Sequence, residues 1–448
     1  MNGVVKNCDC LLCQNRNDIT FPDELLDEIF SGKVSFFIGA GVSTESQSVL
    51  NITFYEDVLT RLQEIPEEVS FPRVMQEFCN QPNGRMKLLQ LIRKRFDTIN
   101  SFPELKQSAT RFHKELGTLF PVKNIITTNW DTYFEDYCNA TPFVSDSDLA
   151  FWEVADRRVL KIHGSIENLS TIVATEDDYE ACSKRLDTEL IGSLLKTILA
   201  TQTVIFVGYS MDDSDFQEVY GFVREQMNLL HRQAYVVTPF QADADRFNGA
   251  GLIPIVTDGA YFIELLKDHA VKQNQLIPDL HFKNVNILLD EVEDEHSLLY
   301  ERLKNSEYPQ VIYAGSYQDG LMHALQRALE TRYSGQYSDK CRLISLIESY
   351  RDIKSDKLGS KNYSDVAYIE GYINGLFFVL IGSEDWDGDQ PPKYFAFGTK
   401  DCLHDFDSFF EFIQDKPQAH KASINYAKRL MKRCDNPDDV VFHHPPWL

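Results

Sequence analysis

The sequence predicts an α/β protein: a Rossmann-like, mostly parallel sheet with helices on both faces, followed by a C-terminal accessory domain of α+β or α/β type. Short apolar runs that suit buried strands alternate with helical patterns through the first part of the chain. A linker-like stretch follows at 268–284, and the pattern then starts again. We therefore expect three parts: a Cys-containing tail (1–18), an α/β domain (19–275) and an accessory, regulatory or oligomerisation domain (285–448).

The α/β domain is predicted to contain six buried strands. Each is a short apolar run, and they fall within residues 34–43, 122–131, 158–165, 202–210, 233–239 and 251–257. Helical patterns precede and separate these runs. The first is PDELLDEIF, with Pro22 near its start and Gly32 as a helix stop. Similar patterns follow at 54–65, 86–96, 131–138 and 188–201. This alternation indicates a parallel sheet.

The C-terminal domain shows a weaker pattern of the same kind. The runs VNILLDEV (285–292) and QVIYAGS (310–316) are predicted as strands, and KYFAFG (393–398) as a further short strand. The rest is helical in pattern, including an aromatic-rich helix with Tyr368 and Tyr372 that suits core packing. A strand-helix opening would permit a nucleotide pocket near Gly315 and Ser316, although no fingerprint supports one.

Composition narrows the classes of function. The chain has 448 residues, and 44 Lys+Arg against 68 Asp+Glu give a formal net charge of −24. Such a negative field argues against a direct nucleic-acid clamp, which needs a basic face. The longest apolar runs, such as the one ending at Gly382, are shorter than the ~20 residues of a membrane helix, so we expect no membrane span.

The N-terminus and the cysteines indicate a cytoplasmic protein. MNGVVKNCDC has no basic flank followed by an apolar core, so no signal peptide is expected. Nine cysteines scattered over the chain do not form a disulfide framework and should be mostly reduced.

Four predicted strands end in glycine or polar clusters: GAGVS (39–43), TTNWD (127–131), KIHGS (161–165) and GYSMDD (208–213). Ligands of parallel sheets bind at the carboxyl ends of the strands, so all four clusters should meet at one crevice. The GAGVS turn offers backbone N–H groups to a pyrophosphate, and His163 supplies an imidazole that can act as a base. Taken singly, each cluster also suits an ordinary glycine turn, an Asn/Asp helix cap or a structural histidine.

In this order, GAGxS, TTNxD, KxHGS and GYS resemble the motifs of the sirtuin superfamily, and more closely those of its bacterial sirtuin-like NAD-hydrolase branch, found in antiphage defence. The resemblance covers roughly residues 20–270 and implies a Rossmann-like domain that binds NAD. It also implies that Asn129 and His163 are the catalytic pair. The cofactor-binding residues that it implies are Gly39, Ala40, Gly41, Ser43, Asp131, Gly208 and Ser210.

Two departures from the family pattern favour hydrolysis over deacylation. The deacylases carry a zinc ribbon between the histidine motif and the GYS-like motif, whereas the interval from Gly164 to Val207 contains Cys182 as its one cysteine. They also follow GAGxS with a GIPDFR-type segment, whereas this chain continues TESQSVLNITF. Docking of a peptide is therefore not indicated, while cofactor binding is retained.

The predicted function is an NAD⁺ hydrolase that releases nicotinamide and ADP-ribose, as a regulated effector of antiphage defence that depletes NAD. Asn129 is expected to order a water or the ribose hydroxyls, and His163 to act as general base. Capture of the ribose cation by another nucleophile would instead give a cyclic ADP-ribose. Two alternatives stay open: an NAD-dependent deacylase or ADP-ribosyltransferase, and a non-catalytic NAD or ADP-ribose sensor.

Other clusters carry weaker signals. Three cysteines near the N-terminus, Cys8, Cys10 and Cys13, have the spacing of metal ligands. They could hold zinc together with a fourth ligand from elsewhere, for which the candidates are His443, His444 and Cys434. They could equally be free thiols. The acidic run at 290–296 could suggest a cation site but is interpreted as a solvated loop or helix start. The run at 384–389 partly resembles a calcium loop but is interpreted as an acidic turn.

A hydrolase of NAD needs control, and residues 285–448 are the expected place for it. They could bind a nucleotide signal, mediate a homo-oligomer or dock a separately encoded ATPase or other defence protein. Nothing in the sequence selects one of these. Any contact with nucleic acid would come through such a partner.

Overall fold

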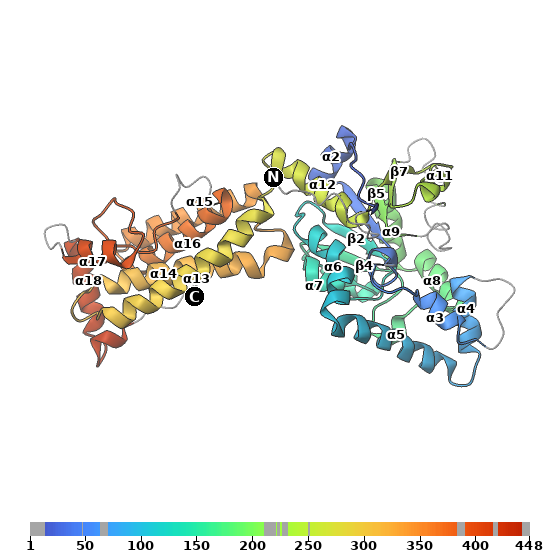
Figure 1. Ribbon diagram of the computed structural model, residues 1–448, viewed down its shortest axis with the longest axis horizontal. Coiled ribbons are helices and arrows are strands. Elements are labelled where there is room, and N and C mark those ends of the chain that lie inside the picture. The colour runs from blue at the N-terminus through green and yellow to red at the C-terminus, as the bar shows by residue number, and fades with distance from the viewer. Residues whose placement is uncertain are drawn as a thin grey trace. The chain divides into compact units, whose positions relative to one another are not determined.

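The computed structural model describes residues 14–46, 48–62, 70–209, 221, 225, 232–249, 251–382, 390–414 and 420–440. The chain divides into two compact units, Met1–Asp268 and His269–Leu448, which we call unit 1 and unit 2 (Figure 1). The stretch 268–284, which the sequence suggests as a linker, contains the end of one helix, residues 273–278 and the start of the next helix.

Unit 1 is built on a parallel sheet of seven strands in the order β3-β4-β2-β1-β5-β6-β7. The strands are β1 (Val34–Ile38), β2 (Asn124–Thr127), β3 (Thr141–Phe143), β4 (Arg158–Lys161), β5 (Thr203–Val207), β6 (Ala234–Thr238) and β7 (Ile253–Val256). All six predicted strands are confirmed. The sequence missed β3, which is only three residues long and has two of them exposed, so it carries no apolar run.

Helices cover both faces of this sheet, as predicted. One face packs against α2 (Asp23–Phe30), α6 (Pro103–Gly117), α7 (Tyr133–Cys138) and α12 (Gly259–Lys272). The other packs against α8 (Glu176–Thr188), α9 (Leu190–Thr201) and α11 (Gln241–Gly249). Successive strand residues point to opposite faces, so Phe36 belongs to the first core and Phe37 to the second. Burial on both faces explains why the strands read as continuous apolar runs.

A small helical lobe lies between β1 and β2 in the chain. It consists of α3 (Phe54–Leu59), α4 (Phe71–Cys79) and α5 (Gly84–Ser101), which share an apolar cluster that also receives Trp130. A reciprocal capping box starts α3: the Thr53 side chain accepts from the backbone of Glu56, and the Glu56 carboxylate accepts from the backbone of Thr53. The lobe therefore stands beside the loop that follows β2.

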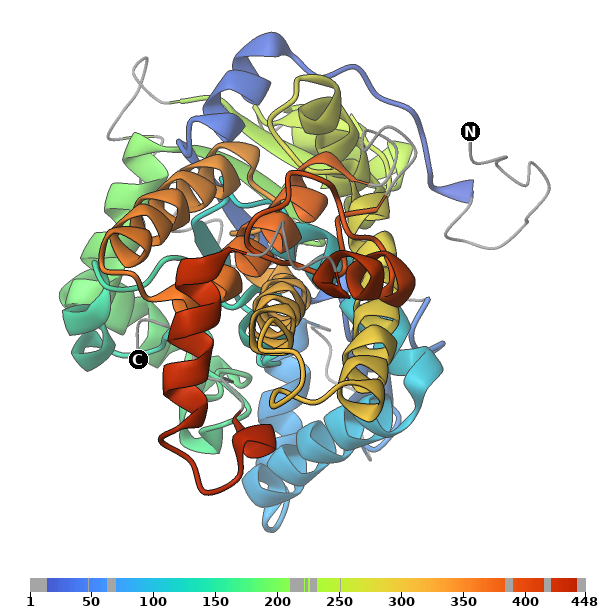
Figure 2. The ribbon, with the colours of Figure 1, turned by 90° about the vertical axis from the view of Figure 1, so that its left-hand side faces the viewer.

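Unit 2 is helical, and the prediction of an α+β or α/β accessory domain is wrong for its described residues (Figure 2). Its helices are α13 (Asp279–Arg302), α14 (Val311–Glu330), α15 (Lys340–Gly359), α16 (Tyr363–Ile381), α17 (Phe406–Gln414) and α18 (Lys421–Met431). The run at 285–292 lies within α13, where Val285, Leu288 and Val292 are buried at helical spacing. The run at 393–398 forms only an isolated bridge between Tyr394 and Leu403.

The suggested nucleotide pocket near Gly315 and Ser316 is also absent, because both residues are buried inside α14. A Cβ at position 315 would fall against the hydroxyl of Tyr300, and the Ser316 hydroxyl donates to the carbonyl of Ile312. Short apolar runs do not distinguish a buried strand from one buried stretch of a long helix, and this ambiguity caused the error.

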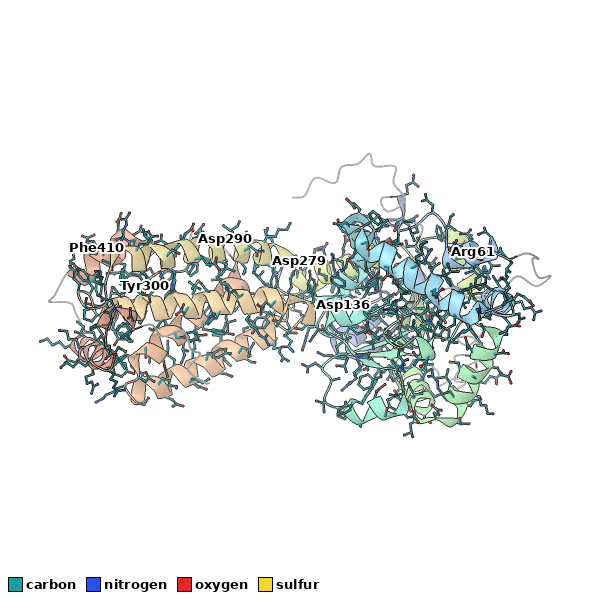
Figure 3. All side chains as sticks on the ribbon, turned by 90° about the horizontal axis from the view of Figure 1, so that it is seen from below. Arg61, Asp136, Asp279, Asp290, Tyr300 and Phe410 are labelled. Carbon is teal, nitrogen blue, oxygen red and sulfur yellow. The ribbon has the colours of Figure 1, made fainter. Side chains whose placement is uncertain are left out.

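Figure 3 marks Asp279, Asp290 and Tyr300 along α13. The acidic run 290–296 lies in the middle of this helix, and Asp290, Glu293 and Asp294 are exposed there. These three residues form a solvated helix face, but the expected loop or helix start is wrong, because the run lies inside a long helix. The other acidic run, 384–389, lies outside the described residues.

The centre of unit 2 is the pairing of α14 with α16. A Cβ on Gly320 would fall on the carbonyl of Tyr368, and one on Gly371 would fall on the carbonyl of Tyr317, so glycine permits the two backbones to approach closely. Among the described residues, α16 is the one helix long and apolar enough to cross a membrane, and 67% of its apolar window is buried inside the protein. Tyr368 and Tyr372 are buried in the core that α16 shares with α13, α14 and α15.

Candidate functional site

The strand order places the candidate site at the centre of the sheet. The central strand β1 pairs with β2 on one side and with β5 on the other, and the chain moves first to the β2 side and returns to β5. Parallel sheets bind ligands at such a switch point, beyond the carboxyl ends of the strands. A cleft of about 870 Å³ lies there, and six predicted site residues line it: Gly39, Ala40, Gly41, Asn129, His163 and Gly208.

The glycine turn after β1 is fastened to the end of β5. The amides of Gly39 and Gly41 donate to the carbonyls of Val207 and Gly208, both at 3.0 Å. Gly208 has a φ of +64°, and a Cβ there would lie 2.5 Å from Cγ1 of Val42. The glycines at 39, 41 and 208 therefore allow two loops to touch, which a side chain would prevent.

This turn uses its amides within the protein. Besides the two glycine amides, those of Val42 and Ser43 donate to the carbonyls of Gly39 and Ala40, at 3.4 and 3.0 Å. The sequence predicts that amides of this turn attract a phosphate. In the structure, four of the five amides of residues 39–43 already have carbonyl acceptors, so the turn offers fewer donors to an anion than its sequence suggests.

Asn129 follows β2, where its amide faces the cleft in a fixed orientation. Its backbone N–H donates to Oγ1 of Thr127 at 3.0 Å, and its Nδ2 donates to the carbonyl of Gly39 at 3.3 Å. Oδ1 is buried and has no hydrogen-bond partner among the described residues. Because Nδ2 is held by the glycine turn, the acceptor Oδ1 is left for a ligand.

His163 follows β4 and lines the same cleft as Asn129, although Asn129 lies 34 residues earlier in the chain. It is 3% exposed, and its ring packs against that of Tyr179 with centroids 5.0 Å apart. Its carbonyl accepts from the amide of Val173 at 3.1 Å. The next residue, Gly164, has a φ of +84° and no room for a Cβ against Thr171, so the HG pair turns the chain sharply at the cleft.

Ser43 and Asp131 lie beneath the cleft and are not among the residues described as lining it. Both are buried, and the Ser43 hydroxyl donates to Oδ2 of Asp131 at 3.3 Å. The amide of Tyr133 donates to the other carboxylate oxygen at 3.2 Å. Burial raises the pKa of Asp131 to about 6, although the nearby charge of Lys161 opposes the shift. These residues support the turn and the β2 loop from below.

Lys161 adds a buried positive charge to this support. Its side chain is fully buried, and Nζ donates to the backbone carbonyl of Asp131 and lies 2.9 Å from Oε1 of Glu135. The lysine of KIHGS thus ties β4 to the loop carrying Asn129.

The cleft and its surroundings include residues that the sequence analysis did not assign to the site. Trp130 lines the cleft with its Nε1 buried and without a partner among the described residues. Glu45 accepts from Nε of Arg95 at 3.1 Å, and Arg95 also donates to the carbonyls of Thr44 and Ile52, which fastens the loop after the turn. Trp130 stands inside TTNWD and could have been found there. Arg95 lies on a helix with no motif.

The lining also includes Arg111, which α6 contributes, and Asp258, from the turn before α12. Nη2 of Arg111 lies 2.5 Å from Oδ1 of Asp258, which also accepts from the amide of Tyr261 at 3.0 Å. No sequence motif marks either residue.

Some of the predicted site residues lie outside the described ranges. One is Ser210. The others are candidate zinc ligands, Cys8, Cys10, Cys13, His443 and His444, so the zinc prediction is untested at those positions. Within the described ranges, no group of three or more His, Cys, Asp or Glu side chains is arranged to hold a metal ion. Cys182, in the interval where deacylases have their zinc ribbon, is buried in the core on α8.

Comparison with known proteins agrees with this geometry. A family model described as a SIR2-like domain matches residues 123–254, which run from β2 into β7. The NAD(+) hydrolase ThsA of Cytobacillus dafuensis is 27% identical over 301 residues, which are 65% of this chain and 57% of the relative. The defense-associated sirtuin 2 of Bacillus subtilis is 26% identical over 245 residues, which are 51% of this chain and 23% of the relative.

The NAD(+) hydrolase ThsA of Bacillus cereus is 26% identical over 223 residues, 48% of this chain and 45% of the relative. The chain thus spans about half the length of two of these relatives, and less of the third. The resemblance to the sirtuin superfamily, and to its sirtuin-like NAD-hydrolase branch, is confirmed.

Proposed function

From the premise that this chain carries a SIR2-like domain, we propose that it is an NAD⁺ hydrolase. It cleaves the bond between nicotinamide and ribose and releases nicotinamide and ADP-ribose. One observation carries the proposal: Asn129 and His163, which come from different strands, line one cleft at the switch point of the sheet. Relatives named NAD(+) hydrolase support the choice of substrate.

The chemistry asks the protein mainly for positioning. Nicotinamide leaves as a neutral molecule, so it needs no strong acid, and the ribose left behind has the character of an oxocarbenium cation. Catalysis then depends on holding the ribose and delivering a nucleophile to its C1. Oδ1 of Asn129 is placed to accept a hydrogen bond from a ribose hydroxyl or from the attacking water.

His163 is proposed as the general base. It takes a proton from the attacking water or from a ribose hydroxyl, and its packing against Tyr179 holds the ring at the cleft. Capture of the cation within the same molecule would give a cyclic ADP-ribose instead. We propose that the remaining cofactor-binding residues act from two levels: Gly39, Ala40, Gly41, Gly208 and Ser210 beside the ligand, and Ser43 and Asp131 beneath it.

The proposal extends to biological context. We propose a cytoplasmic effector of antiphage defence that depletes NAD. The names of two relatives, an NAD(+) hydrolase and a defense-associated sirtuin, support NAD cleavage and a role in defence. Unit 2 would control this effector through a homo-oligomer, a nucleotide signal or a second defence protein. Zinc at the N-terminal cysteines remains part of this proposal, and metal analysis of the purified full chain tests it.

The test is the incubation of NAD with the pure full-length protein, with and without an acyl-lysine peptide, followed by chromatography. Free ADP-ribose without peptide supports the hydrolase. Acyl-ADP-ribose formed only with peptide would instead identify a deacylase, and transfer of ADP-ribose to protein a transferase. Measurable binding without turnover, at all protein concentrations tried, would identify a sensor.

A further inference from the structure

The charges around the cleft do not match a substrate that carries two phosphates. The protein has a net charge of −24, and the described lining includes the carboxylates Glu45, Asp243 and Asp258. The amides of Gly39, Gly41, Val42 and Ser43 already donate to carbonyls. A dianion bound here would need at least one positive partner, because burying an uncompensated charge is costly.

Arg111 is the one residue with a permanent positive charge among the described residues that line the cleft. Its guanidinium is held on one side, where Nη2 lies 2.5 Å from Oδ1 of Asp258. The other amino group, Nη1, is buried and has no hydrogen-bond partner among the described residues. The side chain as a whole is 23% exposed and is part of the cleft lining, while Nη1 itself is buried at the wall of the cleft.

We propose that Arg111 binds the pyrophosphate of the substrate through Nη1. Asp258 fixes the orientation of the guanidinium, which leaves its second amino group for a phosphoryl oxygen. Arg111 is thus a binding residue that supplies the charge which the glycine turn lacks. This inference rests on the proposed function for the identity of the substrate, but it concerns binding and not the reaction.

The neighbouring ion pair supplies a matched control. Lys267 on α12 and Glu115 on α6 join the same two helical segments, with Nζ and Oε2 2.5 Å apart. Lys267 is 8% exposed, and neither of these residues is among those that line the cleft. Loss of this pair costs a comparable structural contact without removing a charge from the cleft.

The experiment measures the dissociation constant of ADP-ribose by calorimetry for the full-length wild type and for R111Q, R111K and K267Q. Loss of a charge-assisted hydrogen bond predicts binding about tenfold to hundredfold weaker in R111Q. R111K keeps the charge and should lose less, and K267Q should stay within about twofold. Equal losses in R111Q and K267Q, or none in R111Q, would overturn the proposal.

Two further measurements separate this inference from the function. R111Q should raise KM for NAD by a similar factor with kcat nearly unchanged, whereas unchanged KM in an active variant overturns only the role of Arg111. Absence of NAD turnover in a wild type that binds ADP-ribose through Arg111 overturns only the hydrolase. NADP is compared with NAD, because an arginine could also bind a 2′-phosphate: a loss confined to NADP would contradict pyrophosphate binding.

Discussion

Buried polar groups at the centre of unit 2 and those around the cleft of unit 1 differ in their hydrogen bonding. In unit 2, the hydroxyl of Tyr317 donates to the carbonyl of Pro392 and accepts from Asn374, and the hydroxyl of Tyr313 donates to the carbonyl of Ser423. In unit 1, three groups that line one cleft have no partner among the described residues: Oδ1 of Asn129, Nε1 of Trp130 and Nη1 of Arg111. Burying such groups without partners costs stability.

The difference teaches where a ligand is expected. Unpartnered buried atoms also occur away from the cleft in both units, for example on His113 and Asn124 in unit 1 and on Asn305, Arg332 and Ser338 in unit 2, and each of these residues lies outside the described lining of the cleft. In unit 1 an acceptor and two donors converge on a cavity. Convergence, and not the mere presence of unpartnered groups, distinguishes a binding site from a local defect in packing.

The largest effect should come from the groups at the cleft. We expect His163→Ala and Asn129→Ala to reduce kcat for NAD by about 10² to 10⁴, because each removes a group placed at the reacting ribose. Asn129→Ala also removes the hydrogen bond from Nδ2 to the carbonyl of Gly39, so it should lower the free energy of unfolding by about 1 kcal/mol, which is too little to explain such a loss of turnover. Turnover is measured as nicotinamide released by the full-length protein.

Tyr317→Phe in unit 2 is the control for this pair. It removes a hydroxyl that bridges Pro392 and Asn374, so it should lower the free energy of unfolding by about 1–3 kcal/mol while NAD turnover stays at the wild-type level. Normal NAD turnover in the cleft variants would contradict the conclusion that the unpartnered groups of the cleft mark the site of the reaction.

The fold of unit 1 was predictable because its strands are buried on both faces. Neighbouring residues of one strand fill opposite cores, as Phe36 and Phe37 or Ile125 and Ile126 do, so each strand appears in the sequence as a continuous apolar run. The same rule failed in unit 2, where α13 and α14 contain equally short apolar runs with buried residues at helical spacing. Only the length of the periodic pattern distinguishes the two cases.

The site was predictable where it depends on backbone shape. Positions 39, 41 and 208 require glycine because two loops touch there. Asn129 and His163 come two residues after the ends of their strands, so the local sequence is enough to identify them as candidates. Arg111 and Asp258 are 147 residues apart and meet only through the fold. Their contact leaves no local pattern, and the sequence cannot report which of the many surface arginines faces a cleft.

A second effect tests the glycine contact at the centre of unit 2. Gly320→Ala should destabilise the protein by about 3 kcal/mol, because the new Cβ falls on the carbonyl of Tyr368 and forces α14 away from α16. Loss of helical circular dichroism during chemical denaturation measures it. NAD turnover under native conditions should be unchanged if unit 2 contributes structure and not chemistry.

Gly359→Ala is the matched control at the end of α15, where a Cβ would meet nothing within 4 Å. This change should be neutral or slightly stabilising, since alanine favours a helix more than glycine does. A loss of stability in Gly359→Ala as large as in Gly320→Ala would contradict the close approach of α14 and α16.

The smallest effect concerns Asp131, a buried group of unit 1 that lies under the cleft. Burial raises the pKa of its carboxyl from 3.8 to about 6, against the opposing charge of Lys161 and with the carboxylate of Glu135 nearby. A raised pKa means that the folded state holds the proton more tightly, so its stabilising effect is complete below about pH 4 and is lost as the pH rises to about 6.

Asp131→Asn has no proton to lose at this position and keeps a polar side chain beside the hydroxyl of Ser43 and the amide of Tyr133. Relative to the wild type, its free energy of unfolding should therefore rise between about pH 4 and pH 6 and stay constant above that range. Chemical denaturation of both proteins at several pH values measures the difference. Parallel curves would mean that this carboxyl is ionised throughout, stabilised by Lys161, Ser43 and the Tyr133 amide more strongly than burial disfavours it.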